Sequence, residues 1–102
     1  MNYPPLQGIA MIIRKGKPED AEACLGIFRL DQEIYWETTD FERSARDNDV
    51  VFLVAEENRR IVGYILGFIV PTKRTEALIH ETRVERRKRK QGIGTELVNA
   101  FC

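Results

Sequence analysis

Two apolar runs joined by a short polar turn constrain the fold of this chain more than any other feature. The first run covers Val50–Ala55, the second covers Ile61–Val70, and polar residues 56–60 separate them. β-branched and aromatic residues dominate both runs, so the pattern predicts an antiparallel hairpin over residues 50–70. Because both runs are almost continuously apolar, we expect both faces of these strands to be covered by helices. Gly63 and Gly67 indicate a bulge or a close approach of another backbone.

The remaining elements follow from breakers and periodicity. Pro18 stands at a first helical position, and Thr39 or Asp40 is the expected cap of a second helix. Around the hairpin we expect a strand over 9–15, helices over 18–30 and about 39–47, a strand over 75–84 and a helix over 94–102. This order predicts an α/β fold of the α+β kind, with a mixed, mostly antiparallel sheet in a single domain of 102 residues.

Charge is unevenly distributed along the chain. Residues 1–60 carry eight basic and twelve acidic residues, a net charge of −4, whereas residues 61–102 carry eight basic and four acidic, a net charge of +4. The C-terminal part is therefore expected to attract an anion. The longest apolar run, Ile61–Val70, is too short to cross a bilayer, so we expect a cytoplasmic protein without a membrane partner. Cys24 and Cys102 lack the spacing of metal ligands, and we expect no metal.

The segment from Val84 to Leu97 has the form of a strand end, a basic turn with the pattern Arg89-x-x-Gly92-x-Gly94, and a helix start. Each part suits a diphosphate. Glycines let the backbone amides approach the ligand, the helix N-terminus adds a partial positive charge, and the basic side chains add full ones. The dinucleotide fingerprint and the P-loop both fail, because there is no third glycine and no Gly-Lys-Ser/Thr.

This stretch resembles the acetyl-coenzyme A (acetyl-CoA) binding motif of the GNAT superfamily of N-acyltransferases, and the order of the elements before it is similar to that family. Ile13-Arg14 followed by Pro18-Glu19-Asp20 also resembles a common opening of the family. The resemblance implies the N-terminal portion of a GNAT-like fold. Family domains continue with a fifth strand, another helix and a closing hairpin, so the chain is expected to be a C-terminally truncated domain.

The resemblance also implies which residues bind the co-substrate. Backbone amides and the arginine of the turn would wrap the pyrophosphate, and the end of the fourth strand would pair its backbone with the pantetheine arm. The amide of Val84 would polarise the acetyl carbonyl. The residues implied for the pyrophosphate are Arg89, Lys90, Gln91, Gly92, Ile93, Gly94 and Thr95, and those for pantetheine are Thr82, Arg83 and Val84.

The family's reaction is direct attack of an amine on the thioester, so an alkylammonium acceptor must first lose a proton. His80 is the expected base, because arylalkylamine members of the family carry functional histidines on this strand. Glu76 is the second catalytic candidate, because strict alternation puts it on the same strand face as His80 and puts Glu81 on the opposite face. The acceptor is expected to be a small-molecule or peptide amine, and the acidic loop 30–40 would line its side of the site.

Two alternatives to an active N-acetyltransferase remain open at this point. One is a non-catalytic CoA-binding remnant, and the other is a nucleic-acid-binding module that uses the basic run 83–90. The neutral overall charge and the lack of a recognition pattern argue against nucleic acid as a partner. Finally, an unpaired edge on the strand 76–84 predicts a homo-oligomer, in the form of a homodimer that completes its sheet across the interface.

Overall fold

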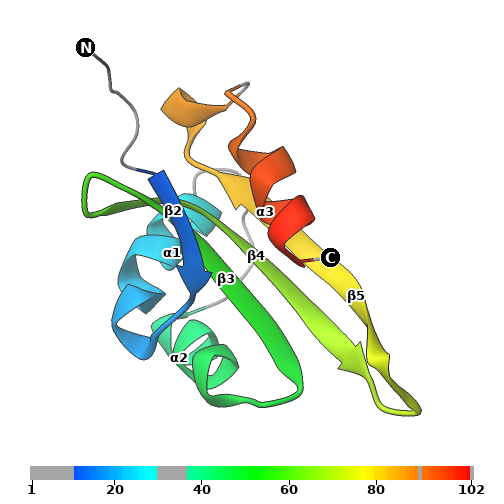
Figure 1. Cartoon of the computed structure of the whole chain (residues 1–102). Helices are drawn as coiled ribbons and strands as arrows, with labels where there is room; N and C mark the ends of the chain where they lie inside the picture. Colours follow the sequence, from blue (N-terminus) through cyan, green and yellow to red (C-terminus); the bar gives the residue numbers. More distant parts are fainter. Residues whose placement is uncertain (1–10, 30–36, 90, 102) are drawn as a thin grey trace.

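The computed structural model describes residues 11–29, 37–89 and 91–101 (Figure 1). The strands are β2 (Met11–Lys15), β3 (Val50–Glu57), β4 (Arg60–Val70) and β5 (Lys73–Val84), and they form one antiparallel sheet in the order β2-β3-β4-β5. The helices are α1 (Ala21–Arg29), α2 (Thr38–Arg46) and α3 (Ile93–Phe101), with short 3-10 turns η1 (Pro18–Asp20) and η2 (Arg86–Lys88). This arrangement confirms the predicted α+β fold class.

Helices cover both faces of the sheet, as the apolar hairpin predicts (Figure 1). Alternate residues of β3 and β4 supply the two cores, because successive side chains of a strand point to opposite faces. On the α1 and α2 face, the rings of Phe41 and Tyr64 meet edge to face with centroids 5.2 Å apart. On the other face, Ile93 and Leu97 of α3 pack against Ile65 of β4.

Gly67 lies beneath the ring of Phe101 at the end of α3 and beside the backbone of β5. A Cβ atom at this position would lie 2.3 Å from that ring and 2.6 Å from the Leu78 carbonyl oxygen, so only glycine fits there. The sequence pattern predicted this kind of close approach. Among the described residues, no helix is long and apolar enough to span a membrane.

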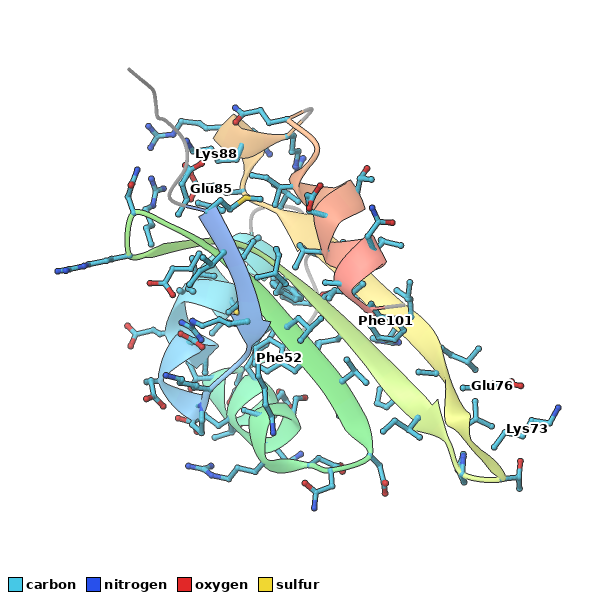
Figure 2. The ribbon with its side chains drawn as sticks, in the orientation of Figure 1. Phe52, Lys73, Glu76, Glu85, Lys88 and Phe101 are labelled. Carbon is cyan, nitrogen blue, oxygen red and sulfur yellow. The ribbon has the colours of Figure 1, made fainter. Side chains whose placement is uncertain are left out.

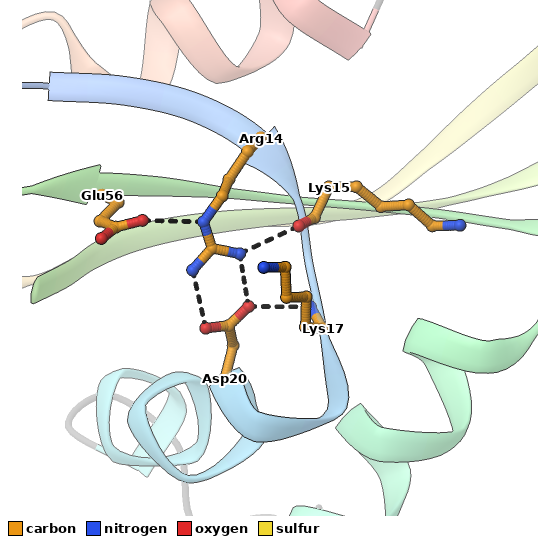
Figure 3. A network of polar contacts seen from close by, with 5 residues as sticks. All are labelled: Arg14, Lys15, Lys17, Asp20 and Glu56. Atoms are coloured by element: carbon orange, nitrogen blue, oxygen red, sulfur yellow. Dashed lines mark hydrogen bonds and ion pairs between the residues drawn. The ribbon is translucent and has the colours of Figure 1, made fainter. Parts of the chain in front are cut away.

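An ion-pair network joins the first strand to the segment that opens α1 (Figure 3). Arg14 donates two hydrogen bonds to the carboxylate of Asp20, at 2.8 and 2.9 Å, and a third to Glu56 on β3, at 2.8 Å. The Lys17 amide donates to the same Asp20 carboxylate at 2.8 Å. Burial alone raises the pKa of Asp20, but the hydrogen bonds from Arg14 and Lys17 outweigh it, so the pKa is lowered.

A two-residue turn connects β3 to β4. Asn58 and Arg59 both have positive φ, at 51° and 66°, which is the conformation of the tight hairpin turn that matches strand twist. Asparagine tolerates this region, whereas arginine is uncommon in it. The hairpin predicted over residues 50–70 therefore closes with one favourable and one strained residue.

Several boundaries differ from the expected ones. β5 begins at Lys73, two residues before the expected start, and α2 begins at Thr38 with Glu37 as its N-cap. Asp40 is not the cap itself. It reaches back from the first turn and accepts a hydrogen bond from the Glu37 amide at 2.8 Å. Residues 9–10, 30–36, 90 and 102, which carry parts of the predicted first strand, acidic loop, turn and last helix, lie outside the described residues.

Candidate functional site

The turn between β5 and α3 contains the motif that the sequence singles out. After β5 the chain makes the single turn η2 and then reaches Gly92, whose φ is +84°. Glycine adopts this left-handed conformation without the steric cost that other residues incur. The Glu96 amide donates to the Gly92 carbonyl at 2.9 Å, which closes the first turn of α3. Gly92 therefore lets the chain reverse and enter the helix at once.

The first turn of α3 presents backbone amides to a pocket of about 240 Å³. The first amides of an α-helix have no acceptor within the helix, and the helix dipole adds positive potential at the same place. Gly94 contributes no side chain, and a Cβ built there would lie 3.8 Å from Val84, an ordinary contact. The pocket is lined by Val84, Lys88, Arg89, Gly92, Ile93, Gly94 and Thr95. Its chemistry is that of an anion site.

Hydrogen bonds and ion pairs hold the basic side chains of this turn. Arg89 donates from Nε to the Val84 carbonyl at 3.0 Å, which fixes its guanidinium beside the end of β5. Lys88 lies 2.6 Å from Glu57, at the β3–β4 turn, and Glu85 pairs with Arg60. Figure 2 shows Glu85 and Lys88 together at this end of the molecule. Part of the basic charge is thus already balanced by acidic groups of the protein itself.

The end of β5 directs backbone amides away from the sheet. The Glu85 amide donates to Val62 on β4 at 2.7 Å. Because neighbouring amides of an extended chain point in opposite directions, the amides of Val84 and Thr82 face the other side of β5. In the described part of the chain, β5 is an edge strand, with β4 as its one partner. Two hydrogen-bond donors therefore line the free edge next to the turn.

A bulge in β5 changes which side chains share a face. Leu66 pairs with Glu81 and Gly67 pairs with Ile79, so His80 is an extra residue in β5. The expectation that Glu81 lies on the face opposite His80 is wrong, because the extra residue breaks the alternation at this point. The His80 ring contacts Phe68, and Glu81 accepts a hydrogen bond from Tyr64, both on the α1 and α2 face.

Glu81 belongs to a partly buried polar group beneath α1. Tyr64 is fully buried, and its burial, together with the hydrogen bond to Glu81, raises the pKa of the phenol above its usual range. The Nε atom of Arg83 lies 3.4 Å from a carboxylate oxygen of Glu81. The Arg83 guanidinium lies over the ring of Phe28, with its Cζ atom 5.5 Å from the ring centroid. The Arg83 side chain thus points toward α1 and not toward the pocket at α3.

Glu76 lies far from the turn. It is exposed near the outer end of the β4–β5 hairpin, 3.8 Å from Lys73, and Figure 2 shows both side chains at that end. Val84 is eight positions after Glu76 along the strand, a distance of about 26 Å at about 3.3 Å per residue. His80 is exposed roughly halfway along the same path. The structure thus brings together the turn residues Arg89, Gly92, Ile93, Gly94 and Thr95 with Val84, and leaves Glu76 apart.

Sequence reasoning missed the pairing of Tyr64 with Glu81. Its only signal in the sequence is a tyrosine within an apolar strand, because a buried phenol requires a hydrogen-bond partner. The identity of that partner depends on the bulge, which the sequence pattern did not assign to His80. Gln91 is exposed and its amide lies 3.4 Å from the Arg87 carbonyl. Lys90 lies outside the described residues.

Comparison with protein families gives one match over most of the chain. The sequence model described as the acetyltransferase (GNAT) family matches residues 19–102. No curated protein sequence matches the chain.

Several solved structures share this fold. Ard1 from Thermoplasma volcanium is 29% identical and has a TM-score of 0.77, with 91% of this chain and 62% of that chain covered. The PaiA N-acetyltransferase from Thermoplasma acidophilum, solved in complex with coenzyme A, is 19% identical and has a TM-score of 0.77, with 91% of this chain and 70% of that chain covered. Diaminobutyrate acetyltransferase EctA from Paenibacillus lautus, solved with its substrate and coenzyme A, is 20% identical and has a TM-score of 0.77, with 88% of this chain and 55% of that chain covered. The chain thus spans less than two thirds of the length of the first and third of these proteins.

Proposed function

Because the chain belongs to the acetyltransferase (GNAT) family, we propose that it binds acetyl-CoA at the turn between β5 and α3 and transfers the acetyl group to an amine. The observation that carries this proposal is the coincidence, in one pocket, of left-handed Gly92, the first amides of α3 and the Arg89 guanidinium. Two structures of similar fold contain coenzyme A, which supports the choice of ligand.

In this proposal the pyrophosphate lies against the first turn of α3. The amides of Ile93, Gly94 and Thr95 donate to its oxygens, and the helix dipole adds to their effect. Arg89 supplies a charge-assisted hydrogen bond from the same side, because the bond from its Nε to the Val84 carbonyl holds its guanidinium beside the pocket that it lines. Lys88 contributes less, since Glu57 balances its charge.

The pantetheine arm then follows the free edge of β5. Its two amide groups pair with the backbone of residues 82–84, as a further strand would. The outward amide that the arm leaves unpaired, that of Thr82 or Val84, donates a hydrogen bond where negative charge develops on the thioester oxygen during attack. Arg83 contributes through its backbone, because its side chain packs against Phe28 and Glu81.

The amine acceptor approaches from the α1 and α2 face. His80 and Glu81, which the bulge brings onto this face, are the groups we propose to accept the proton of the acceptor ammonium, through water. We favour these two over Glu76, which lies at the far end of the hairpin. The acceptor is a small-molecule or peptide amine. The diaminobutyrate acetyltransferase of similar fold was solved with its substrate L-2,4-diaminobutyric acid, which is a small-molecule amine.

The test is a coenzyme A titration followed by an acetyl-transfer assay with a panel of amines. Binding and transfer together support an N-acetyltransferase, whereas binding without transfer to any amine supports a CoA-binding remnant. Tight DNA or RNA binding that weakens steeply with salt, with no coenzyme A binding, would favour the nucleic-acid alternative. Two ion pairs argue against that outcome, because they reduce the positive charge offered to phosphates. Lys88 pairs with Glu57, and Arg60 pairs with Glu85.

A further inference from the structure

A second and larger hollow lies between α1 and the segment that follows β5. Its volume is about 470 Å³, within the range of roughly 300–1,000 Å³ that is usual for small-molecule sites. It shares no lining residue with the pocket at α3. Its lining residues are Ala23, Gly26, Ile27, Arg60, Ile61, Glu85, Arg86 and Arg87.

The apolar part of the lining contains a glycine that the described packing does not require. Gly26 lies inside α1, where glycine is less favourable than alanine because it restricts the backbone least in the unfolded chain. A Cβ atom at Gly26 would meet nothing within 4 Å. Its missing side chain instead leaves space beside Ala23, Ile27 and Ile61. The glycine therefore costs helix stability and keeps the hollow open.

The charged part of the lining presents cations. Glu85 and Arg60 form one ion pair in the lining, so their charges largely cancel. Arg86 and Arg87 add two further guanidinium groups to the same lining. An apolar floor beneath an excess of arginine is suited to an anion that carries an apolar tail.

We propose that this hollow binds a small carboxylate with an unbranched apolar chain. The carboxylate pairs with Arg87 at the edge, and the chain lies over Gly26 between Ile27 and Ile61. Guanidinium groups bind carboxylates through paired hydrogen bonds, and burial of the chain supplies the remaining driving force. The inference does not depend on the proposed transfer reaction, because no residue of the turn at Gly92 lines this hollow.

The experiment is a titration of the isotope-labelled protein with octanoate, followed through the backbone amide signal of Gly26. We expect a saturable shift with octanoate, and no saturation at the same concentrations with acetate, which lacks the tail, or with octylammonium, which has the opposite charge. Replacement Gly26→Leu fills the hollow and should weaken octanoate binding at least about tenfold, a loss of about 1.4 kcal/mol. The matched variant Gly26→Ala adds one methyl group to the same helix and should weaken binding less.

Charge variants provide an independent test if Gly26→Leu does not fold. The double change Arg86→Gln with Arg87→Gln should weaken octanoate binding, whereas Arg59→Gln, outside the hollow, should not. Equal octanoate affinity in Gly26→Leu and the unmodified chain would overturn the proposal. So would saturable binding of octylammonium, or a Gly26 signal that shifts with protein concentration alone, which would mean that a second copy fills the hollow. A coenzyme A titration of Gly26→Leu should match the unmodified chain, which separates this result from failure of the transfer proposal.

Discussion

The phenol of Tyr64 on β4 donates a hydrogen bond to the carboxylate of Glu81 across the β4–β5 pair, beneath α1. Tyr64 has no solvent contact, so its hydroxyl depends on this acceptor. We expect Tyr64→Phe to lower the free energy of unfolding by about 1–3 kcal/mol, because Glu81 then loses a donor while it remains partly buried. Urea denaturation measures this loss. The double variant Tyr64→Phe with Glu81→Gln should regain part of it, and equal stability of Tyr64→Phe and the unmodified chain would contradict the pairing.

Acid should destabilise the protein through the network around Asp20. Its pKa is below the ordinary value of 3.8, so the folded state holds this carboxylate deprotonated more strongly than the unfolded state does. The resulting stability is complete above pH 3.8 and is lost as the pH falls through the lowered folded-state value. Denaturation at a series of pH values measures how steeply the free energy of unfolding falls with pH. Asp20→Asn should make this dependence shallower. Glu22 is an exposed acid on α1, so Glu22→Gln should leave the dependence unchanged.

The strained turn between β3 and β4 offers a stabilising change. Arg59 has φ of 66°, a conformation that costs residues other than glycine about 1–2 kcal/mol. We expect Arg59→Gly to raise the free energy of unfolding by about 1 kcal/mol, because Asn-Gly is the preferred pair for this turn. The neighbouring change Asn58→Gly should gain less, since asparagine tolerates the same region. A decrease in the melting temperature of Arg59→Gly would show that the turn differs from the one described.

Exposed apolar residues at the outer end of the β4–β5 hairpin predict self-association. Leu78 and Ile79 on β5 are 68% and 44% exposed, and Phe68 on β4 is 46% exposed. An edge strand with such a surface is a template for another strand, so we expect a homodimer that pairs β5 with β5. Sedimentation at tens of micromolar should give a dimer, and Leu78→Lys should give a monomer. If the unmodified chain also sediments as a monomer, the charged side chains of β5 are sufficient to protect its edge.

The parts of the fold that depend on local pattern were accessible from the sequence. The hairpin over 50–70 follows from its apolar runs, and the helix start follows from Gly92 and Gly94. Long-range pairings were not accessible, because no periodicity links Arg14 to Asp20 and Glu56 or Tyr64 to Glu81. The faces of the residues after His80 were not accessible from the sequence either. The bulge at His80 adds a single extra residue, which reverses the expected face of every residue after it.

In the candidate site too, the features set by local pattern were predictable and those set by long-range packing were not. The turn was predictable because each of its residues acts through backbone conformation or charge near its own position. The face shared by His80 and Glu81, and the inward direction of Arg83, depend on packing against β4 and α1. The direction of a side chain on β5 therefore required the structure, whereas the turn conformation at Gly92 did not.

The most direct test of the central claim is calorimetric titration of coenzyme A into the chain and into Gly94→Val. A valine Cβ at position 94 has room in the folded chain, so the variant should fold with little change in stability. Its branched side chain nevertheless extends into the pocket lined by the first amides of α3. The exposed change Ala100→Val, also on α3, is the matched control. We predict micromolar binding to the unmodified chain and to Ala100→Val, and loss of binding in Gly94→Val. Absence of binding heat at millimolar coenzyme A, or equal binding by all three proteins, would contradict the account.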